Sequence, residues 1–322
     1  MMEIKQLTRI NIIITLVVLI GNIFYQGLGF SYPLKIVCSS GFAITGIINY
    51  AYATRKIEEK RILSFMALGL IFAFLGDVAI NPNFILGVIF FALGHVFFVD
   101  SYLIYKPLHK WDILLCLGLG VFSISFILCF PYILFEVSVL KYVVLVYACI
   151  ISVMVGKSVG NAICEKSIFT CMIMLGSILF FISDMMLLLA WFSKIEGRWT
   201  SHVCMATYYP ALCLLAGSMV LYVKTNVKKD ADSENIFARV MQMEKYYDEV
   251  QDTLNKDDTN INGKKKIVEM VQSLREYQVS GQWLKDYEND EKGKLPSELK
   301  RGVLSEDGLY NLLNEVEKRL ST

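Results

Sequence analysis

Long apolar runs alternate with short polar connections over the first two thirds of the chain. Each run is long enough to cross a hydrocarbon core about 30 Å thick, which takes roughly 20 helical residues. Connections such as Asn81-Pro82-Asn83 are so short that neighbouring helices must be antiparallel and packed together. The pattern predicts eight transmembrane helices, near residues 10–29, 34–53, 62–80, 84–105, 112–130, 140–160, 168–192 and 202–223.

The last third of the chain has the polarity of a soluble domain, although apolar residues still recur at helical spacing. One such series runs from Phe237 to Val250, and another from Leu309 to Leu320. The sequence therefore predicts an all-α protein of two parts. Residues 1–229 form a polytopic integral membrane bundle, and residues 230–322 form a small helical soluble domain.

Lysine and arginine are distributed unevenly among the connections. One side of the predicted membrane holds 13 of them, Lys157 included, and the other side holds only Lys35, Lys141, Lys194 and Arg198. Because positive connections face the cytoplasm, this predicts a multi-pass protein of the cell membrane with both termini cytoplasmic. The first run resembles a signal peptide but lacks a small-residue cleavage site, so we expect a retained span.

The net charge of +1 combines two opposite parts, because residues 230–322 hold 14 basic and 20 acidic residues, a net of −6. The remainder is +7, and neither part has the dense basic surface of a nucleic-acid binder. All eight cysteines fall in the membrane part without a Cys-x-x-Cys pair, which predicts reduced packing residues. The acidic cluster of the tail lacks calcium-loop spacing and is expected to be solvated; its members are Asp286, Glu288, Asp290 and Glu291.

Three ionisable residues, Asp77, His95 and Asp184, stand inside the predicted membrane spans. A charged side chain at that depth costs roughly 2.5–3.5 kcal/mol on insertion scales, so such residues usually bind, relay protons or catalyse. From the predicted orientation they fall between the midplane and the outer leaflet. The tyrosines at the same depth are Tyr147, Tyr208 and Tyr209. We therefore expect one polar pocket in the outer half of the bundle.

The two carboxyl groups suit proton transfer, since desolvation favours holding at least one of them protonated or paired. The alternative is that each carboxyl group hydrogen-bonds a neighbouring helix and only fixes packing. His95 fits a proton relay or a residue that orients water. A zinc site of His95 with both aspartates is a further alternative that nothing in the spacing demands. No metal or cofactor is predicted, and Ser183 is a candidate to orient Asp184 or bind substrate.

Five stretches of the membrane part resemble one family. They read LGDVAI, FILGVIFFALGHVFFVDSYL, VYACIISVMVG, GSILFFISDMMLLLAWF and ATYYPAL. Their order and placement resemble the lysoplasmalogenase, or YhhN-like, family of eight-span membrane proteins. The tail, over about residues 237–320, resembles a small acidic domain family of unknown function, and we expect it to contact a cytosolic protein. In that tail Trp283 is either a core residue or a contact residue for the partner.

The resemblance implies hydrolysis of the vinyl ether bond of lysoplasmalogens, which releases a fatty aldehyde and a glycerophospho-headgroup. Asp77, His95 and Asp184 match the polar positions of the family, and we expect them to be catalytic. The three tyrosines match accompanying positions, and we expect them, with Ser183, to bind the substrate. The chain departs from the pattern in two places. The family often has Tyr shortly after its His, where Phe97 and Phe98 stand here, and Gln after the Tyr-Tyr pair, where Leu212 stands.

Vinyl ethers hydrolyse by proton transfer to carbon and addition of water to an oxocarbenium ion. The residues meet that demand if one aspartate is the acid and the other stabilises the positive charge. The predicted partners are therefore a lysophospholipid substrate and membrane lipids. Two readings of another class stay open: a lipid-binding sensor with a regulatory tail, and a proton-coupled lipid transporter. The chain lacks an obvious inverted repeat, which argues mildly against transport.

Overall fold

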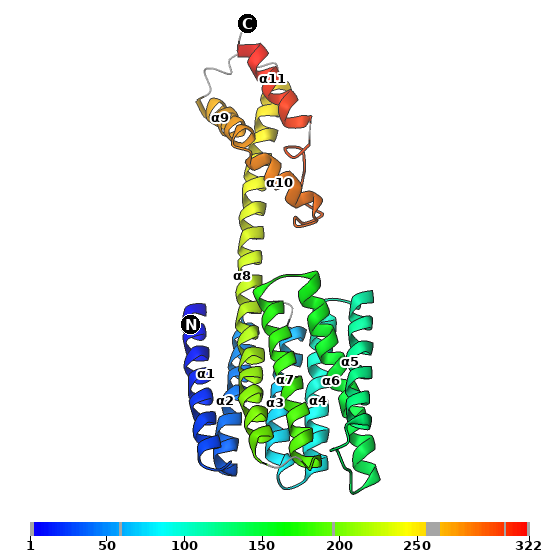
Figure 1. Ribbon diagram of the computed structural model, residues 1–322. Coiled ribbons are helices and arrows are strands. Elements are labelled where there is room, and N and C mark those ends of the chain that lie inside the picture. The colour runs from blue at the N-terminus through cyan, green and yellow to red at the C-terminus, as the bar shows by residue number, and fades with distance from the viewer. Residues whose placement is uncertain (1–2, 58–59, 195–196, 256–264, 306, 321–322) are drawn as a thin grey trace. The chain divides into compact units, whose positions relative to one another are not determined.

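A computed structural model describes residues 3–57, 60–194, 197–255, 265–305 and 307–320. Within these ranges all regular secondary structure is helical, apart from one isolated bridge between Ile133 and Ser193. The helices, labelled in Figure 1, are α1 (Ile4–Gly27), α2 (Tyr32–Ala53), α3 (Arg61–Ile80), α4 (Phe84–Tyr105), α5 (Lys110–Cys129), α6 (Ser138–Cys164), α7 (Ile168–Phe192), α8 (Trp199–Asn255), α9 (Lys265–Val279), α10 (Gln282–Glu291) and α11 (Gly308–Leu320). The chain divides into two compact units, Met1–Asn226 and Val227–Thr322.

The predicted all-α membrane bundle is confirmed: eight of the described helices are long and apolar enough to cross a membrane. The largest difference from the predicted spans is in α8. It does not end near residue 223 but continues to Asn255. The sequence after Gly217 explains this, because it is rich in Lys, Asp and Glu and has neither Gly nor Pro before residue 255 to stop the helix.

Helices α3 and α4 pack closely because glycines lie at their contact. A Cβ atom on Gly87 would come 2.5 Å from the Cα of Ile80, and one on Gly94 would come 3.1 Å from the carbonyl oxygen of Gly69. Both approaches require a residue without a side chain, as is common between transmembrane helices. The turn before α4 is fixed by Asn83, whose side chain accepts the Leu86 N–H at 3.1 Å.

Many large apolar side chains of the first unit are exposed on the protein surface. Such a belt would be an aggregation hazard in water, but it is the expected lipid-facing surface of a bundle within a membrane. Its most exposed members include Ile13, Val17, Ile23, Leu117, Val121, Val146 and Ile168.

The second unit has its own apolar core. Side chains from the C-terminal part of α8 meet those of α9 and α11 there, among them Val240, Val250, Met270, Leu274, Leu312 and Val316. Trp283 packs against this core, and its indole N–H donates to the carbonyl oxygen of Val303 at 2.8 Å. Trp283 is therefore a packing residue, the first of its two predicted roles.

One prediction for this unit is wrong: the acidic cluster is not uniformly solvated. Asp286 is fully buried, and its carboxylate accepts two hydrogen bonds from the guanidinium of Arg239, at 2.6 and 2.8 Å. Tyr277 and Gln282 donate to it as well, at 3.0 and 3.1 Å. A buried carboxylate is tolerated when it is paired and hydrogen-bonded in this way.

Candidate functional site

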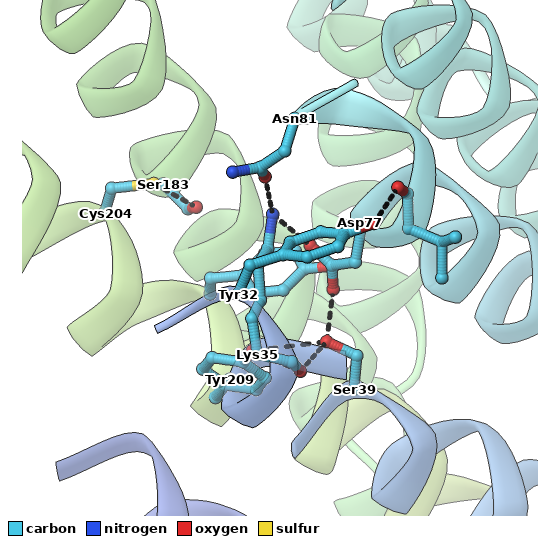
Figure 2. Close-up of polar contacts among 10 residues, drawn as sticks. Tyr32, Lys35, Ser39, Asp77, Asn81, Ser183, Cys204 and Tyr209 are labelled. Atoms are coloured by element: carbon cyan, nitrogen blue, oxygen red, sulfur yellow. Dashed lines mark hydrogen bonds and ion pairs between the residues drawn. The ribbon is translucent and has the colours of Figure 1, made fainter. Parts of the chain in front are cut away.

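Asp77 lies near the end of α3. The start of α2 and the first turns of α8 surround it. Its side chain is almost completely buried. Lys35 Nζ is 3.1 Å from Oδ1, while Ser39 and Tyr208 donate hydroxyl hydrogen bonds to Oδ2 at 2.6 and 2.7 Å. Figure 2 shows how Lys35 and Ser39 of α2 approach the carboxylate. Three donors from two other helices therefore hold Asp77.

Lys35 is a site residue that the sequence analysis missed, because it was assigned to a connection. The structure places it inside α2, one turn from its start, and buries it. Its ammonium also donates to Asn81 at 3.4 Å, and its carbonyl oxygen accepts from Tyr209 at 3.2 Å (Figure 2). The signal in the sequence was a lysine at the same depth as an intramembrane aspartate, since charges buried in a bilayer are usually paired.

Asp184, His95 and Tyr147 form a second group, and His95 lies midway along α4. The Tyr147 hydroxyl donates to Asp184 Oδ2 at 2.6 Å. His95 Nε2 is 2.8 Å from that hydroxyl and 3.3 Å from Asp184 Oδ2. Because the only hydroxyl hydrogen of Tyr147 goes to Asp184, the Tyr147 oxygen accepts the hydrogen of His95 Nε2. The other ring nitrogen, Nδ1, is buried without a hydrogen-bond partner.

A small cavity of about 40 Å³ borders this second group. That volume accommodates one or a few water molecules. Asp184 and Tyr147 supply its polar wall, and the remaining lining side chains are apolar: Phe84, Val88, Phe91, Ile127, Val144, Ala148, Met185, Leu187, Leu188 and Phe192. The cavity therefore joins a carboxyl group to a surface suited to hydrocarbon.

The predicted single pocket is instead two polar groups with aromatic rings between them. The ring of Phe180 lies 4.6 Å from that of His95 and 5.4 Å from that of Tyr208, centroid to centroid. Phe91 contacts Tyr208 as well, at 6.1 Å, and also lines the cavity beside Asp184. We call the two groups the Asp77 cluster (Lys35, Ser39, Asp77, Tyr208 and Tyr209) and the Asp184 cluster (His95, Tyr147 and Asp184).

Ser183 belongs to neither cluster by its hydrogen bonding. Its hydroxyl lies 3.4 Å from the sulfur of Cys204. Figure 2 draws this contact. Its role in orienting Asp184 or substrate stays a prediction.

Metal chemistry gains no support from the arrangement. The zinc alternative needed His95 and both aspartates together, but Asp77 lies in the other cluster. Within the described part of the chain, no group of three or more His, Cys, Asp or Glu side chains is placed to hold a metal ion.

A second buried ion pair of the first unit, also missed from the sequence, lies at the end of the bundle opposite to the Asp77 cluster. Lys157 Nζ is 2.7 Å from Asp112 Oδ2 and 3.1 Å from the carbonyl oxygen of Pro107. Lys157 was assigned to a connection, but it lies within α6 and is buried. This pair joins α5 to α6 and shares no residue with either cluster, and we assign it a packing role.

Comparison with known proteins places these features in a family. The model of the YhhN family matches residues 37–219, more than half of the chain. The chain belongs to the YhhN family. The matched range contains all seven predicted site residues, whereas Lys35 precedes it. A second family model, a domain of unknown function named DUF4298, matches residues 240–321. No curated protein and no solved structure matches the chain. The resemblance to the YhhN family and to a small domain of unknown function is thus confirmed.

Proposed function

We propose that this member of the YhhN family is an integral membrane hydrolase that cleaves the vinyl ether bond of lysoplasmalogens. The observation that carries the proposal is the Asp184 cluster beside an apolar cavity within the membrane unit. Asp184 can donate a proton, and Tyr147 holds its carboxyl group. The cavity beside them has space for water and an apolar surface suited to an alkenyl chain.

In the proposed reaction Asp184 is the acid. Tyr147 and His95 both contact Oδ2, and in the proposed reaction Oδ1 carries the proton. Asp184 transfers this proton to the outer carbon of the double bond, and the ether oxygen shares the positive charge of the resulting oxocarbenium ion. The carboxylate formed at that moment is the nearby anion that stabilises this cation.

Water then completes the reaction. It adds to the oxocarbenium carbon, and its proton passes to the carboxylate of Asp184, which restores the acid. The hemiacetal collapses to a fatty aldehyde and the glycerol hydroxyl of the headgroup. His95 and Tyr147 keep the carboxyl group oriented throughout, because both contact its Oδ2.

Asp77 has a supporting role in this proposal and does not transfer the proton. Its carboxylate is already matched by the ammonium of Lys35 and by two hydroxyl donors. A carboxylate held in this way is a poor proton donor, so Asp77 serves the electrostatics and packing of the site and leaves proton transfer to Asp184.

The test is aldehyde release from lysoplasmenyl-ethanolamine by the full-length protein purified in detergent. Asp184→Asn is expected to abolish release, while Asp77→Asn reduces it. Asp100→Asn, on the same helix as His95 but outside both clusters, is the matched control and keeps wild-type activity. Size-exclusion chromatography checks that each variant is folded. No release by folded wild-type protein contradicts the proposal for this substrate, and activity in Asp184→Asn contradicts the assignment of the acid.

A further inference from the structure

The second unit carries an open groove of about 670 Å³ along one face of α8. Phe237 and Met241 form an apolar floor together with Leu299 of the segment after α10. Met241 is 54% exposed, on the face of α8 that lines the groove. From Phe237 to Asp252 the groove follows about 22 Å of helix, or four turns.

The wall opposite α8 is held in place by Arg301. Its guanidinium makes a two-pronged ion pair with Asp290, at 2.7 and 3.0 Å. The same guanidinium donates to the carbonyl oxygens of Pro296, Ser297 and Leu299. The segment that forms the wall is therefore fixed from within, and the groove needs no ordering before it binds.

Glu244 attaches this wall to α8. Its carboxylate accepts the backbone N–H groups of Gly302 and Val303, at 3.0 and 2.6 Å. A Cβ atom at position 302 would lie 2.7 Å from Glu244 Oε1, so a side chain there would displace this carboxylate. The groove is thus a built feature of the unit.

The rim of the groove is acidic. Five acidic and two basic side chains line it, a net of −3, namely Glu244, Asp248, Glu249, Asp252, Glu298, Lys245 and Lys300. The pKa of Lys300 is raised because Asp248 accepts a hydrogen bond from it and because Glu244 and Asp252 add negative charge nearby. Among the described residues, no Lys or Arg pairs with Asp252 or Glu298 within ion-pair distance, so the rim keeps acceptors for a cationic partner.

We propose that this groove binds a basic, amphipathic helical segment of a partner protein. Apolar side chains of such a segment cover Phe237, Met241 and Leu299, while its lysines and arginines meet the acidic rim. The length of the groove matches about 15 residues of helix. Charge decides the class of occupant, because an acidic peptide or an anionic lipid surface is repelled by the rim.

The experiment uses the full-length protein in nanodiscs of zwitterionic lipid, with empty nanodiscs as background. The probe is a fluorescent peptide of about 16 residues that places leucines on one helical face and lysines on the other. Binding is followed by fluorescence anisotropy at low and at raised salt. We expect saturable binding that weakens with salt.

Three variants locate the binding. Asp252→Asn with Glu298→Gln breaks no ion pair of the described residues and is expected to weaken binding about three- to tenfold. Met241→Ser removes part of the apolar floor and is expected to weaken binding by a similar factor. The matched control is Glu269→Gln with Glu276→Gln, which removes two exposed acids from α9, a helix that contributes nothing to the groove. No binding above empty nanodiscs overturns the proposal. Equal weakening by the control also overturns it, because the attraction then belongs to the net charge of the unit.

Discussion

Lys35 Nζ lies 3.1 Å from Asp77 Oδ1, and both side chains are buried within the membrane unit. The pair joins the first turn of α2 to the last turn of α3. It balances the charge of one of the two intramembrane aspartates, whereas the other, Asp184, contacts a tyrosine and a histidine. The division of roles that we propose for the two carboxyl groups rests on this contact.

Removal of Lys35 alone is predicted to destabilise the protein strongly. Lys35→Met leaves the carboxylate of Asp77 buried without its counter-charge, and breaking one partner of such a pair costs about 3–5 kcal/mol. We therefore expect a large fall in the midpoint of thermal unfolding in detergent. The double variant Lys35→Met with Asp77→Asn recovers most of it, because no charge is then left alone. Additive losses in this double-mutant cycle would show that the two residues do not interact energetically.

Loss of the Tyr147 hydroxyl is predicted to slow the proposed reaction without changing the fold. Tyr147→Phe removes the donor to Asp184 Oδ2 and the acceptor for His95 Nε2. We expect about a tenfold fall in kcat for aldehyde release and little change in KM, since the hydroxyl orients the acid and does not hold the lipid. Tyr142→Phe, an exposed position on α6, is the control. A rise in KM at constant kcat would instead assign Tyr147 to substrate binding.

The hydrophobic pattern was sufficient to predict the eight spans and the helical tail. A bilayer imposes a fixed length and excludes backbone that is not helical, so long apolar runs have few alternative structures. The errors concerned charged residues near the ends of these apolar runs. Lys35 and Lys157 were counted as surface residues, but each is buried inside a helix beside an aspartate. A count of charges along the chain does not show that a lysine is paired with an aspartate of another helix.

The sequence identified candidate site residues but did not predict how they group in the structure. Asp77 lies in the last turn of α3, whereas His95 lies midway along α4. Whether they meet depends on the rotation of each helix about its axis, which a uniformly apolar span does not encode. Phe180 illustrates the difficulty: in the sequence it is one more apolar residue, yet its ring contacts both clusters. The sequence therefore predicted one pocket, whereas the structure has two groups.

The second unit is predicted to lose stability at alkaline pH through Tyr277. Burial raises the pKa of this phenol above its usual value, and the negative charge of Asp286 raises it further. The stability that the neutral Tyr277 phenol contributes is complete below the pKa of tyrosine in the unfolded chain, about 10. It is lost as the pH rises from there toward the pKa of Tyr277 in the folded protein. The slope reaches about 1.4 kcal/mol per pH unit for one proton.

This loss can be measured by urea unfolding between pH 8 and pH 12, followed by the fluorescence of Trp283. The other tryptophans, Trp111, Trp191 and Trp199, are replaced by Phe so that the signal reports on the second unit alone. Tyr277→Phe should be less stable at neutral pH, because Asp286 loses a donor, but its stability should fall less steeply with pH. Tyr310→Phe, an exposed tyrosine of α11, should keep the wild-type slope. Parallel pH profiles for wild type and Tyr277→Phe would assign the alkaline loss to another group.

Two glycines of the membrane unit are predicted to respond in opposite directions to the same substitution. Gly87→Ala places a Cβ atom 2.5 Å from the backbone of Ile80, so α3 and α4 must move apart, at a cost of about 1–3 kcal/mol. Gly118, on α5, has no atom within 4 Å of a built Cβ. Gly118→Ala should therefore be neutral or stabilise by up to about 1 kcal/mol through helix propensity. Thermal unfolding of both variants in the same detergent compares them directly. Equal effects would mean that the contact between α3 and α4 does not depend on the missing side chain at position 87.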